Sequence, residues 1–256
     1  NAGAFAFTDI LPLASPGILR KAPKWLLDPL GPLSIPPAYA LQITPWLYRF
    51  WRACSPRAVA ASTTAQTALM DLSRAELEPF LTATDTFAML RKDGNLQVYE
   101  SEAELRASLP GWQARAAHGI EFRHMTVQEM ATLQPGLSPR FTHGTFTPGW
   151  YSIADPKDYV LALAERFRAQ GGVIHRADVI GLSPQGSEVY IQTRGEPLKA
   201  DQVVLAAGAF SHQIARCLGE RIPLETERGY NTTLPPDAVD LRCQITFGGH
   251  GFVITR

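Results

Sequence analysis

The residues best suited to close contact with a ligand form a small-residue turn, Ala206-Ala207-Gly208, after the apolar run that starts at Val203. Small side chains let backbone atoms approach a ligand, and glycine adopts conformations that other residues avoid. A buried parallel strand over 203–207 that ends in this turn and leads into a short helix over 211–218 is typical of a nucleotide site. Any α/β protein can carry such a strand end, so the neighbouring segments must decide its meaning.

Four neighbouring segments give the turn a context. Asp155-Pro156 opens an amphipathic helical pattern, Gly171-Gly172 precedes an expected strand over 173–179, and Arg228-Gly229-Tyr230 follows the turn. With these segments the chain resembles the FAD-dependent amine and amino-acid oxidoreductases, which include D-amino-acid dehydrogenase, D-amino-acid oxidase, glycine oxidase and sarcosine oxidase. The opening Asn1-Ala2-Gly3 resembles an element of the D-amino-acid dehydrogenase branch.

The resemblance implies an α/β fold of two interleaved lobes. Residues 1–54 and 155–222 are expected in a Rossmann-like FAD-binding lobe, and residues 55–154 and 223–256 in a mainly antiparallel substrate lobe. Members of the family begin with a Gly-x-Gly-x-x-Gly turn, which this sequence lacks. We therefore expect an interior portion of a longer enzyme; the alternative is a complete protein with an unusual start.

The resemblance also implies three groups of backbone contacts to FAD. Their residues are Asn1, Ala2 and Gly3, then Val179, and finally Ala206, Ala207 and Gly208. The first group is expected at the pyrophosphate or flavin ring, Val179 at the adenine edge, and the third group at the diphosphate and ribose. For Val179 the alternative is an ordinary buried strand residue.

The substrate side is expected at four residues: His250, Phe252, Tyr230 and Tyr151. Relatives clamp the substrate carboxylate with an arginine in a later Gly-x-Arg segment that this sequence does not contain, and no catalytic residue is assigned. His250 and Phe252 stand where relatives have a His-x-Tyr pair, and a period of two would place both on one strand face. The alternatives are an exposed loop histidine among glycines and, for the two tyrosines, packing against neighbours.

The function that the resemblance implies is FAD-dependent oxidation of the C–N bond of an amino acid, with a D-amino acid as the expected substrate, to an imine and oxo acid. Two alternatives stay open: a glycine- or sarcosine-type amine oxidase, and a flavin-fold accessory subunit that binds without turnover. The electron acceptor is unknown.

Composition narrows the location and the partners. The 24 Lys and Arg balance the 24 Asp and Glu, which argues against nucleic acid as a partner. Three distant cysteines suggest a reducing, cytoplasmic setting and offer no metal site. Trp46, Leu47, Phe50 and Trp51 form an apolar stripe beside Arg49 and Arg52. Such a stripe is more often core, but it also suits peripheral contact with the inner face of a membrane.

The remaining pattern predicts the elements that position these residues. Helices are expected over 17–28, 46–53, 56–82, 102–117 and 127–133, a strand over 120–124, extended segments over 140–154, and long antiparallel strands from Glu225 onward. Asp93-Gly94 predicts a hairpin turn between strands at 87–90 and 96–99. Thr126 and Glu129 have the spacing of a capping box.

Overall fold

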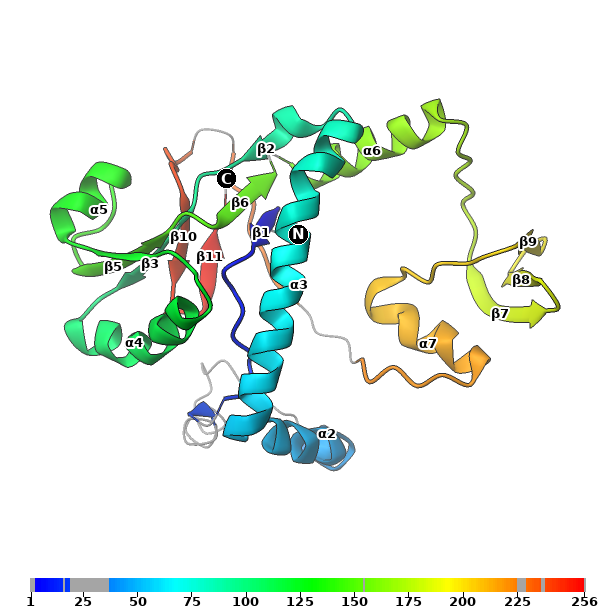
Figure 1. Cartoon of the computed structure of the whole chain (residues 1–256), viewed down its shortest axis with the longest axis horizontal. Coiled ribbons are helices and arrows are strands. Elements are labelled where there is room, and N and C mark those ends of the chain that lie inside the picture. The colour runs from blue at the N-terminus through cyan, green and yellow to red at the C-terminus, as the bar shows by residue number, and fades with distance from the viewer. Residues whose placement is uncertain are drawn as a thin grey trace. The chain divides into compact units, whose positions relative to one another are not determined.

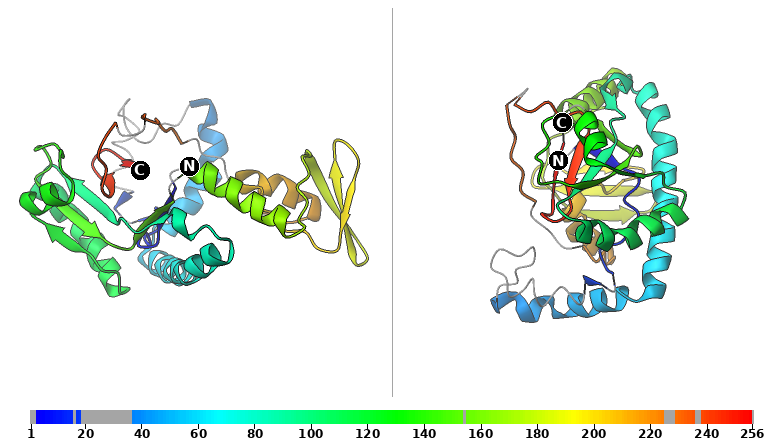
Figure 2. Two further views of the ribbon diagram at one scale, coloured as in Figure 1. Left: turned by 90° about the horizontal axis from the view of Figure 1, so that it is seen from above. Right: turned by 90° about the vertical axis from the view of Figure 1, so that its left-hand side faces the viewer.

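The computed structural model describes residues 3–15, 17–18, 37–153, 155–224, 229–235 and 238–255. The chain forms two compact units (Figures 1 and 2). Unit 1 comprises Asn1–Arg166 and Val239–Arg256, and unit 2 comprises Phe167–Ala238. The expected helix over 17–28 lies almost wholly outside the described residues.

Unit 1 contains most of the helices that the sequence predicts. They are α2 (Ala40–Ala53), α3 (Pro56–Ala83), α4 (Glu102–Ala117), α5 (Val127–Leu133) and α6 (Pro156–Ala169), which continues into unit 2. Side chains begin three of them: Ser55 accepts from the Ala58 N–H at the start of α3, Ser101 from Glu104 at α4, and Thr126 with Glu129 forms the predicted capping box at α5. The predictions for these helices are confirmed.

The larger sheet of unit 1 has five strands in the order β11-β10-β3-β5-β4. Their bounds are β11 Phe252–Ile254, β10 Gln244–Phe247, β3 Asn95–Tyr99, β5 His143–Thr147 and β4 Arg123–Met125. The β3–β10 pair is parallel and the other pairs are antiparallel. The expected mainly antiparallel sheet is confirmed, but β4 starts later than predicted and the strands after Glu225 are short.

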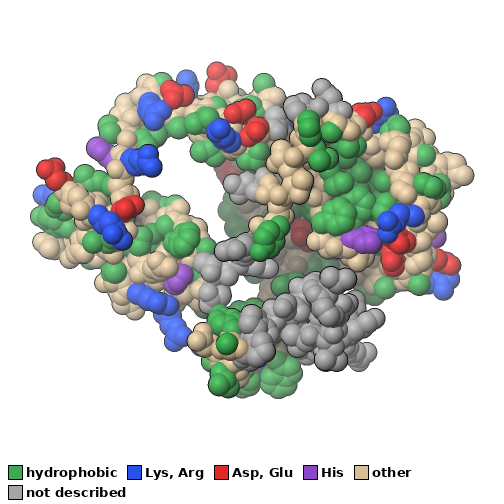
Figure 3. All heavy atoms as spheres, turned by 180° about the vertical axis from the view of Figure 1, so that it is seen from behind, with side chains coloured by type: hydrophobic (Ala, Val, Ile, Leu, Met, Phe, Trp, Pro, Cys, Tyr) green, Lys and Arg blue, Asp and Glu red, His purple; other side chains and the backbone are tan. Residues whose placement is uncertain are grey.

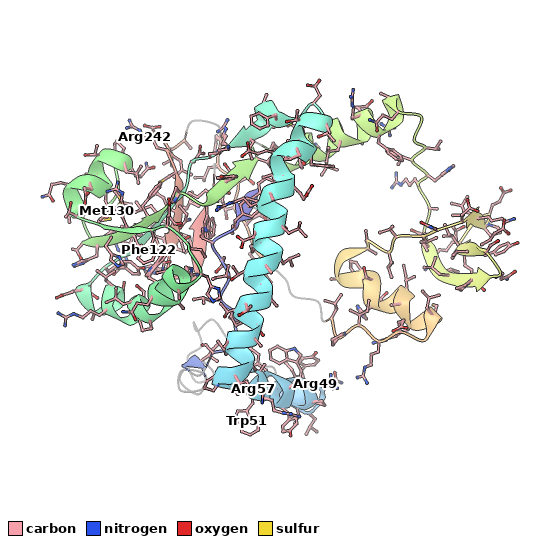
Figure 4. All side chains as sticks on the ribbon, in the orientation of Figure 1. Arg49, Trp51, Arg57, Phe122, Met130 and Arg242 are labelled. Carbon is pink, nitrogen blue, oxygen red and sulfur yellow. The ribbon has the colours of Figure 1, made fainter. Side chains whose placement is uncertain are left out.

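The register gives this sheet one apolar and one polar face. Leu96 and Val98 of β3 share a face with Ile245 and Phe247 of β10, and these four residues belong to one buried cluster with Met130 of α5. A Cβ on Gly144 would lie 2.4 Å from the Met130 sulfur, so α5 packs closely on the sheet (Figure 4).

The opposite face of the sheet is polar, and its buried side chains are hydrogen-bonded. Asn95 pairs with Thr246 through their side chains at 2.9 Å. Tyr99, on the same face by alternation, accepts from the indole N–H of Trp112 in α4 at 2.8 Å. Because these buried groups are partnered, this face contributes to the packing of α4 on the sheet.

The predicted hairpin at Asp93-Gly94 is wrong. β2 (Leu90–Arg91) pairs with β6 (Trp150–Ile153) in a three-stranded sheet that also contains β1 (Ala4–Ala6), whereas β3 belongs to the larger sheet. Gly94 connects the two sheets: its N–H donates to the Trp150 carbonyl and its own carbonyl accepts from Gln244 N–H. A turn signal marks a change of direction, but it does not specify which strand is the partner.

Unit 2 contains the antiparallel meander β7 (Val179–Gln185), β8 (Glu188–Thr193) and β9 (Leu198–Ala200). It then forms α7 (Ser211–Ala215) and a 3-10 turn (Arg216–Leu218), which confirms the predicted helix over 211–218. The predicted strands over 173–179 and 203–207 are wrong: 172–178 and 202–207 are irregular, and Val204 is 89% exposed. A parallel strand needs hydrogen-bonding neighbours, and the described residues provide none for these two segments.

The described helices include none that is both long enough and apolar enough to cross a membrane. The predicted helix at 46–53 is confirmed as part of α2. The axes of α2 and α3 meet at a steep angle (Figure 2, right).

Candidate functional site

The β10–β11 hairpin of unit 1 presents His250 in its turn. Gly248 to Gly251 form the loop, and the N–H groups of His250 and Gly251 both donate to the Phe247 carbonyl, at 3.0 and 2.9 Å. Gly251 has φ +69°, a conformation that favours glycine. His250 therefore lies in the turn before β11, and the prediction that it lies on the strand with Phe252 is wrong because the four-residue loop precedes the strand.

An ionic cluster holds the His250 side chain. Its Nε2 lies 2.6 Å from the Glu100 carboxylate, and the Arg140 guanidinium binds the same carboxylate oxygen. Arg140 Nη2 is also 3.2 Å from His250 Nε2, but Nε2 cannot accept that hydrogen bond while it donates to Glu100. The hydrogen bond from His250 and then that from Arg140 lower the pKa of the Glu100 carboxyl. The turn is thus tied to the end of β3 and to the loop before β5.

Aromatic rings extend from this cluster. The ring of Phe252 stacks on Phe247 with centroids 4.5 Å apart, and Phe247 contacts Phe141 at 5.3 Å. His250 lies 6.1 Å from Phe252, so the structure brings these two predicted site residues together. Phe252 is 50% exposed and offers an apolar surface next to the hydrogen-bonded His250–Glu100 pair.

Tyr151 has the surroundings of a core residue in the smaller sheet. Its ring meets Phe7 edge-on at 5.5 Å, the Lys92 ammonium lies 5.4 Å from the ring centroid, and the residue packs against a buried cluster that includes Leu81 and Ile153. Its carbonyl accepts from the Gln244 amide at 3.0 Å. Core packing accounts for these contacts, and a role toward substrate stays a prediction.

Gly3 is required by the backbone around it. It has φ +59°, and a Cβ there would lie 3.0 Å from the Ile153 carbonyl and 3.1 Å from Pro156. Its carbonyl accepts from the Ile153 N–H at 2.8 Å. Asn1 and Ala2, the other two residues of this expected cofactor contact, lie outside the described residues.

In unit 2 the small-residue turn is open to solvent. Ala206, Ala207 and Gly208 are exposed, Gly208 has φ +55°, and a Cβ on Gly208 would meet no atom within 4 Å. Val179 pairs with Thr193 at the start of β7 and is exposed, so its interpretation as a buried strand residue is wrong. Tyr230 is 87% exposed.

The open turn fits the cofactor that the sequence resemblance implies. A dinucleotide needs backbone that its phosphates and riboses can approach, and the exposed Ala206-Ala207-Gly208 segment offers such backbone with short side chains. These three residues would hold that part of FAD, and Val179 would meet the adenine.

Sequence reasoning missed Glu100 and Arg140. Glu100 stands just before Ser101, which caps α4. The partners lie 40 and 150 residues apart along the chain. Sequence proximity therefore gave no signal for this cluster.

Comparisons with known proteins agree with this architecture. A family model described as FAD dependent oxidoreductase (DAO) matches residues 38–256. A D-amino-acid oxidase of Bradyrhizobium diazoefficiens is 33% identical over 238 residues, which make up 91% of this chain and 56% of that protein. A D-amino acid dehydrogenase of Vibrio cholerae is 30% identical over 243 residues, covering 92% of this chain and 57% of that protein.

Solved structures show the same fold. Glycine oxidase from Geobacillus kaustophilus superposes with a TM-score of 0.53 at 20% identity, over 60% of this chain and 42% of that one. L-amino acid deaminase from Proteus vulgaris, with its specific insertion deleted, gives 0.52 at 20% identity, over 61% and 43%. The fold is thus the mixed α/β fold of these flavin oxidoreductases.

The chain belongs to the FAD dependent oxidoreductase (DAO) family. It spans a little more than half the length of the curated relatives that it matches. The expected fold class and family are confirmed.

Proposed function

We propose that the complete protein is an FAD-dependent enzyme that oxidises the C–N bond of a D-amino acid to an imine, which water then hydrolyses to the oxo acid and ammonia. The observation that carries this proposal is the similarity over nine-tenths of the chain to proteins named D-amino-acid oxidase and D-amino acid dehydrogenase. The bound flavin would supply the hydride acceptor for the carbon that carries the amine.

We assign cofactor binding and substrate binding to the two expected lobes. Residues 1–54 and 155–222 would hold the cofactor, chiefly through the backbone of Asn1 to Gly3, Val179 and the Ala206-Ala207-Gly208 turn. Residues 55–154 and 223–256 would bind the substrate. The open turn in unit 2 and the hydrogen-bonded hairpin in unit 1 support this assignment.

On the substrate side, His250 is the residue best placed to hydrogen-bond a polar group. It is 42% exposed, and the Glu100 carboxylate orients its ring. Phe252 beside it would contact an apolar side chain, and Tyr230 and Tyr151 are the further residues proposed to line the pocket. An imidazole oriented by a carboxylate binds substrate with less loss of rotamer entropy than a free one.

The test is flavin reduction without oxygen in the full-length protein. His250→Ala should leave the FAD content unchanged and lower kcat/KM about ten- to a hundredfold, the effect of one lost hydrogen bond. His118→Ala, which alters a histidine at the C-cap of α4, is the matched control and should change neither quantity. An unchanged rate of flavin reduction in His250→Ala would remove His250 from the substrate site.

The substrate panel separates the alternatives. Bleaching of the flavin by D-amino acids supports the main proposal, and bleaching by glycine or sarcosine alone supports an amine oxidase of that type. A flavin that dithionite reduces but that no amino acid or amine bleaches indicates an accessory subunit without turnover.

We also propose a cytoplasmic location with peripheral contact to the inner face of a membrane. The exposed aromatic side chains of α2 support this contact. Recovery of the full-length protein in the membrane fraction, and its release by high salt, would test it; recovery in the soluble fraction at low salt would contradict it.

A further inference from the structure

Helix α2 exposes almost all of its apolar side chains. The large exposed ones are Leu41, Trp46, Leu47, Tyr48 and Trp51. Ile43 and Phe50 are half-buried, and Cys54 at the junction with α3 is buried. An exposed cluster of large apolar side chains on one short helix indicates an interaction surface. The space-filling view shows apolar side chains over α2 (Figure 3).

Most apolar side chains of α2 form one broad stripe, with the arginines beside and opposite it. Trp46 and Phe50, four residues apart, stack with ring centroids 5.0 Å apart, and Ile43 and Leu47 share their side by the same helical spacing. Arg52 stands opposite this side, and Arg49, three residues after Trp46, lies at its edge. Tyr48 and Trp51, at 5.9 Å, lie between the two sides.

The charge of this region has one sign. Between residues 40 and 70 the sequence contains Arg49, Arg52 and Arg57 and neither aspartate nor glutamate. In the part of the chain that the structure describes, none of the three arginines forms an ion pair. Three guanidinium groups without carboxylate partners are complementary to an anionic surface.

A groove at the α2–α3 corner combines both features. It has a volume of about 830 Å³ and is lined by Tyr48, Trp51, Arg52 and Arg57, among others. Figure 4 shows Arg49, Trp51 and Arg57 around this corner. Arginine beside tryptophan and tyrosine suits a phosphate group at a water–hydrocarbon boundary, because aromatic rings with a polar edge favour that depth.

We propose that α2 lies in the headgroup layer of an anionic phospholipid bilayer. Trp46, Leu47 and Phe50 would enter the acyl boundary, and Arg52 and Arg57 would bind lipid phosphate at the α2–α3 groove. The proposal deepens the membrane contact proposed above and rests on it. An anionic bilayer provides both an apolar layer for the aromatic side chains and phosphate groups for the arginines. A purely apolar protein partner would leave three cations without counter-charges.

The experiment is flotation of the full-length protein with vesicles of phosphatidylcholine alone or mixed with phosphatidylglycerol. The protein should float with the mixed vesicles and much less with the neutral ones. The triple variant Arg49→Gln, Arg52→Gln, Arg57→Gln should lower binding to the mixed vesicles about a hundredfold. Trp51→Ser, which keeps the charge, should also weaken binding.

The control changes the net charge equally at exposed arginines elsewhere in unit 1. Arg106→Gln, Arg123→Gln, Arg242→Gln should retain binding. Equal loss in both triple variants, or equal binding to both vesicle types, would overturn the anionic-lipid site but keep a membrane contact. Failure to bind either vesicle type, including the case in which self-association covers α2, would overturn both. Flavin reduction measured on the same samples reports the proposed enzymatic function separately.

Discussion

Units 1 and 2 differ in how far they bury their apolar side chains and pair their backbone. Unit 1 buries two hydrophobic clusters between sheets and helices. In the described part of unit 2 the buried hydrophobic residues are Leu182 and Ala215, and the segment 202–207 has exposed apolar side chains and no strand partner. The difference indicates that unit 1 is stabilised by its own packing, whereas unit 2 presents backbone that a ligand can contact.

Two glycines with positive φ test this difference most strongly. Gly94 in unit 1 has φ +74°, and a Cβ there would lie 2.4 Å from the Phe146 ring and 2.9 Å from the Thr147 carbonyl. Gly186 in unit 2 has φ +62° and open space around it. Both Ala variants meet the backbone penalty of about 1 kcal/mol, and Gly94→Ala adds overpacking of about 1–3 kcal/mol.

Urea unfolding of the two variants gives the measurement. We expect Gly94→Ala to lower the free energy of unfolding by about 2–4 kcal/mol and Gly186→Ala by about 1 kcal/mol. Equal losses would contradict the close packing of Gly94 against β5.

The same contrast explains how much of the fold the sequence predicts. Helices such as α3 and α4 depend on local signals, because the serine that caps each one stands next to the segment that it caps. The prediction of a strand at Val203 is wrong because an apolar run indicates burial but does not indicate which strand would pair with it. The hairpin at Asp93-Gly94 fails for the same reason: Gly94 bonds to Trp150 and Gln244, which are far away in sequence.

In the candidate site, too, neighbours in sequence are predicted and partners from distant segments are not. His250 and Phe252 are neighbours in sequence and come together in the structure. Glu100, the partner of His250, and Arg140, which binds the same carboxylate, come from distant segments, so the tertiary structure is needed to reveal this cluster. The small residues before Gly208 predict backbone that a ligand can approach, and the turn is exposed, but residues 202–207 do not form the expected strand.

Helix capping is a smaller test of the contrast. Helix α5 begins with a complete capping box at Thr126, whereas α7 in unit 2 begins at Phe210 without a side-chain cap. Thr126→Ala should lower the free energy of unfolding by about 1 kcal/mol, because the Glu129 N–H loses its acceptor. Thr132→Ala in the same helix should cost less, since its hydroxyl donates to a carbonyl that already belongs to the helix. An equal cost for both would mean that the cap does not stabilise unit 1.

The smallest expected effect concerns the ionic cluster. The pKa of Glu100 lies below its ordinary value of 4.5, with the hydrogen bond from His250 as the largest cause. A lowered folded-state pKa contributes stability above the ordinary pKa, and this contribution is lost as the pH falls through the folded-state value. Removing the histidine should therefore raise the pKa of Glu100 toward 4.5.

Carbon NMR of the Glu100 carboxyl in the wild type and in His250→Asn measures this change. Glu129 is the internal control, because its pKa is lowered chiefly by the Thr126 N–H and should stay in place. A Glu100 titration that does not move in His250→Asn would contradict the hydrogen bond that orients His250.

The central claim is that the open turn of unit 2 binds the FAD of an amino-acid oxidoreductase. The most direct measurement is the flavin-to-protein ratio of the purified full-length protein for wild type, Gly208→Val and Gly186→Val. Both glycines have positive φ and open surroundings, so the two variants share the backbone strain and differ in their place in unit 2. We predict that Gly208→Val loses FAD because the branched side chain occupies the space of the cofactor, while Gly186→Val keeps it. Full FAD content in Gly208→Val would contradict the claim.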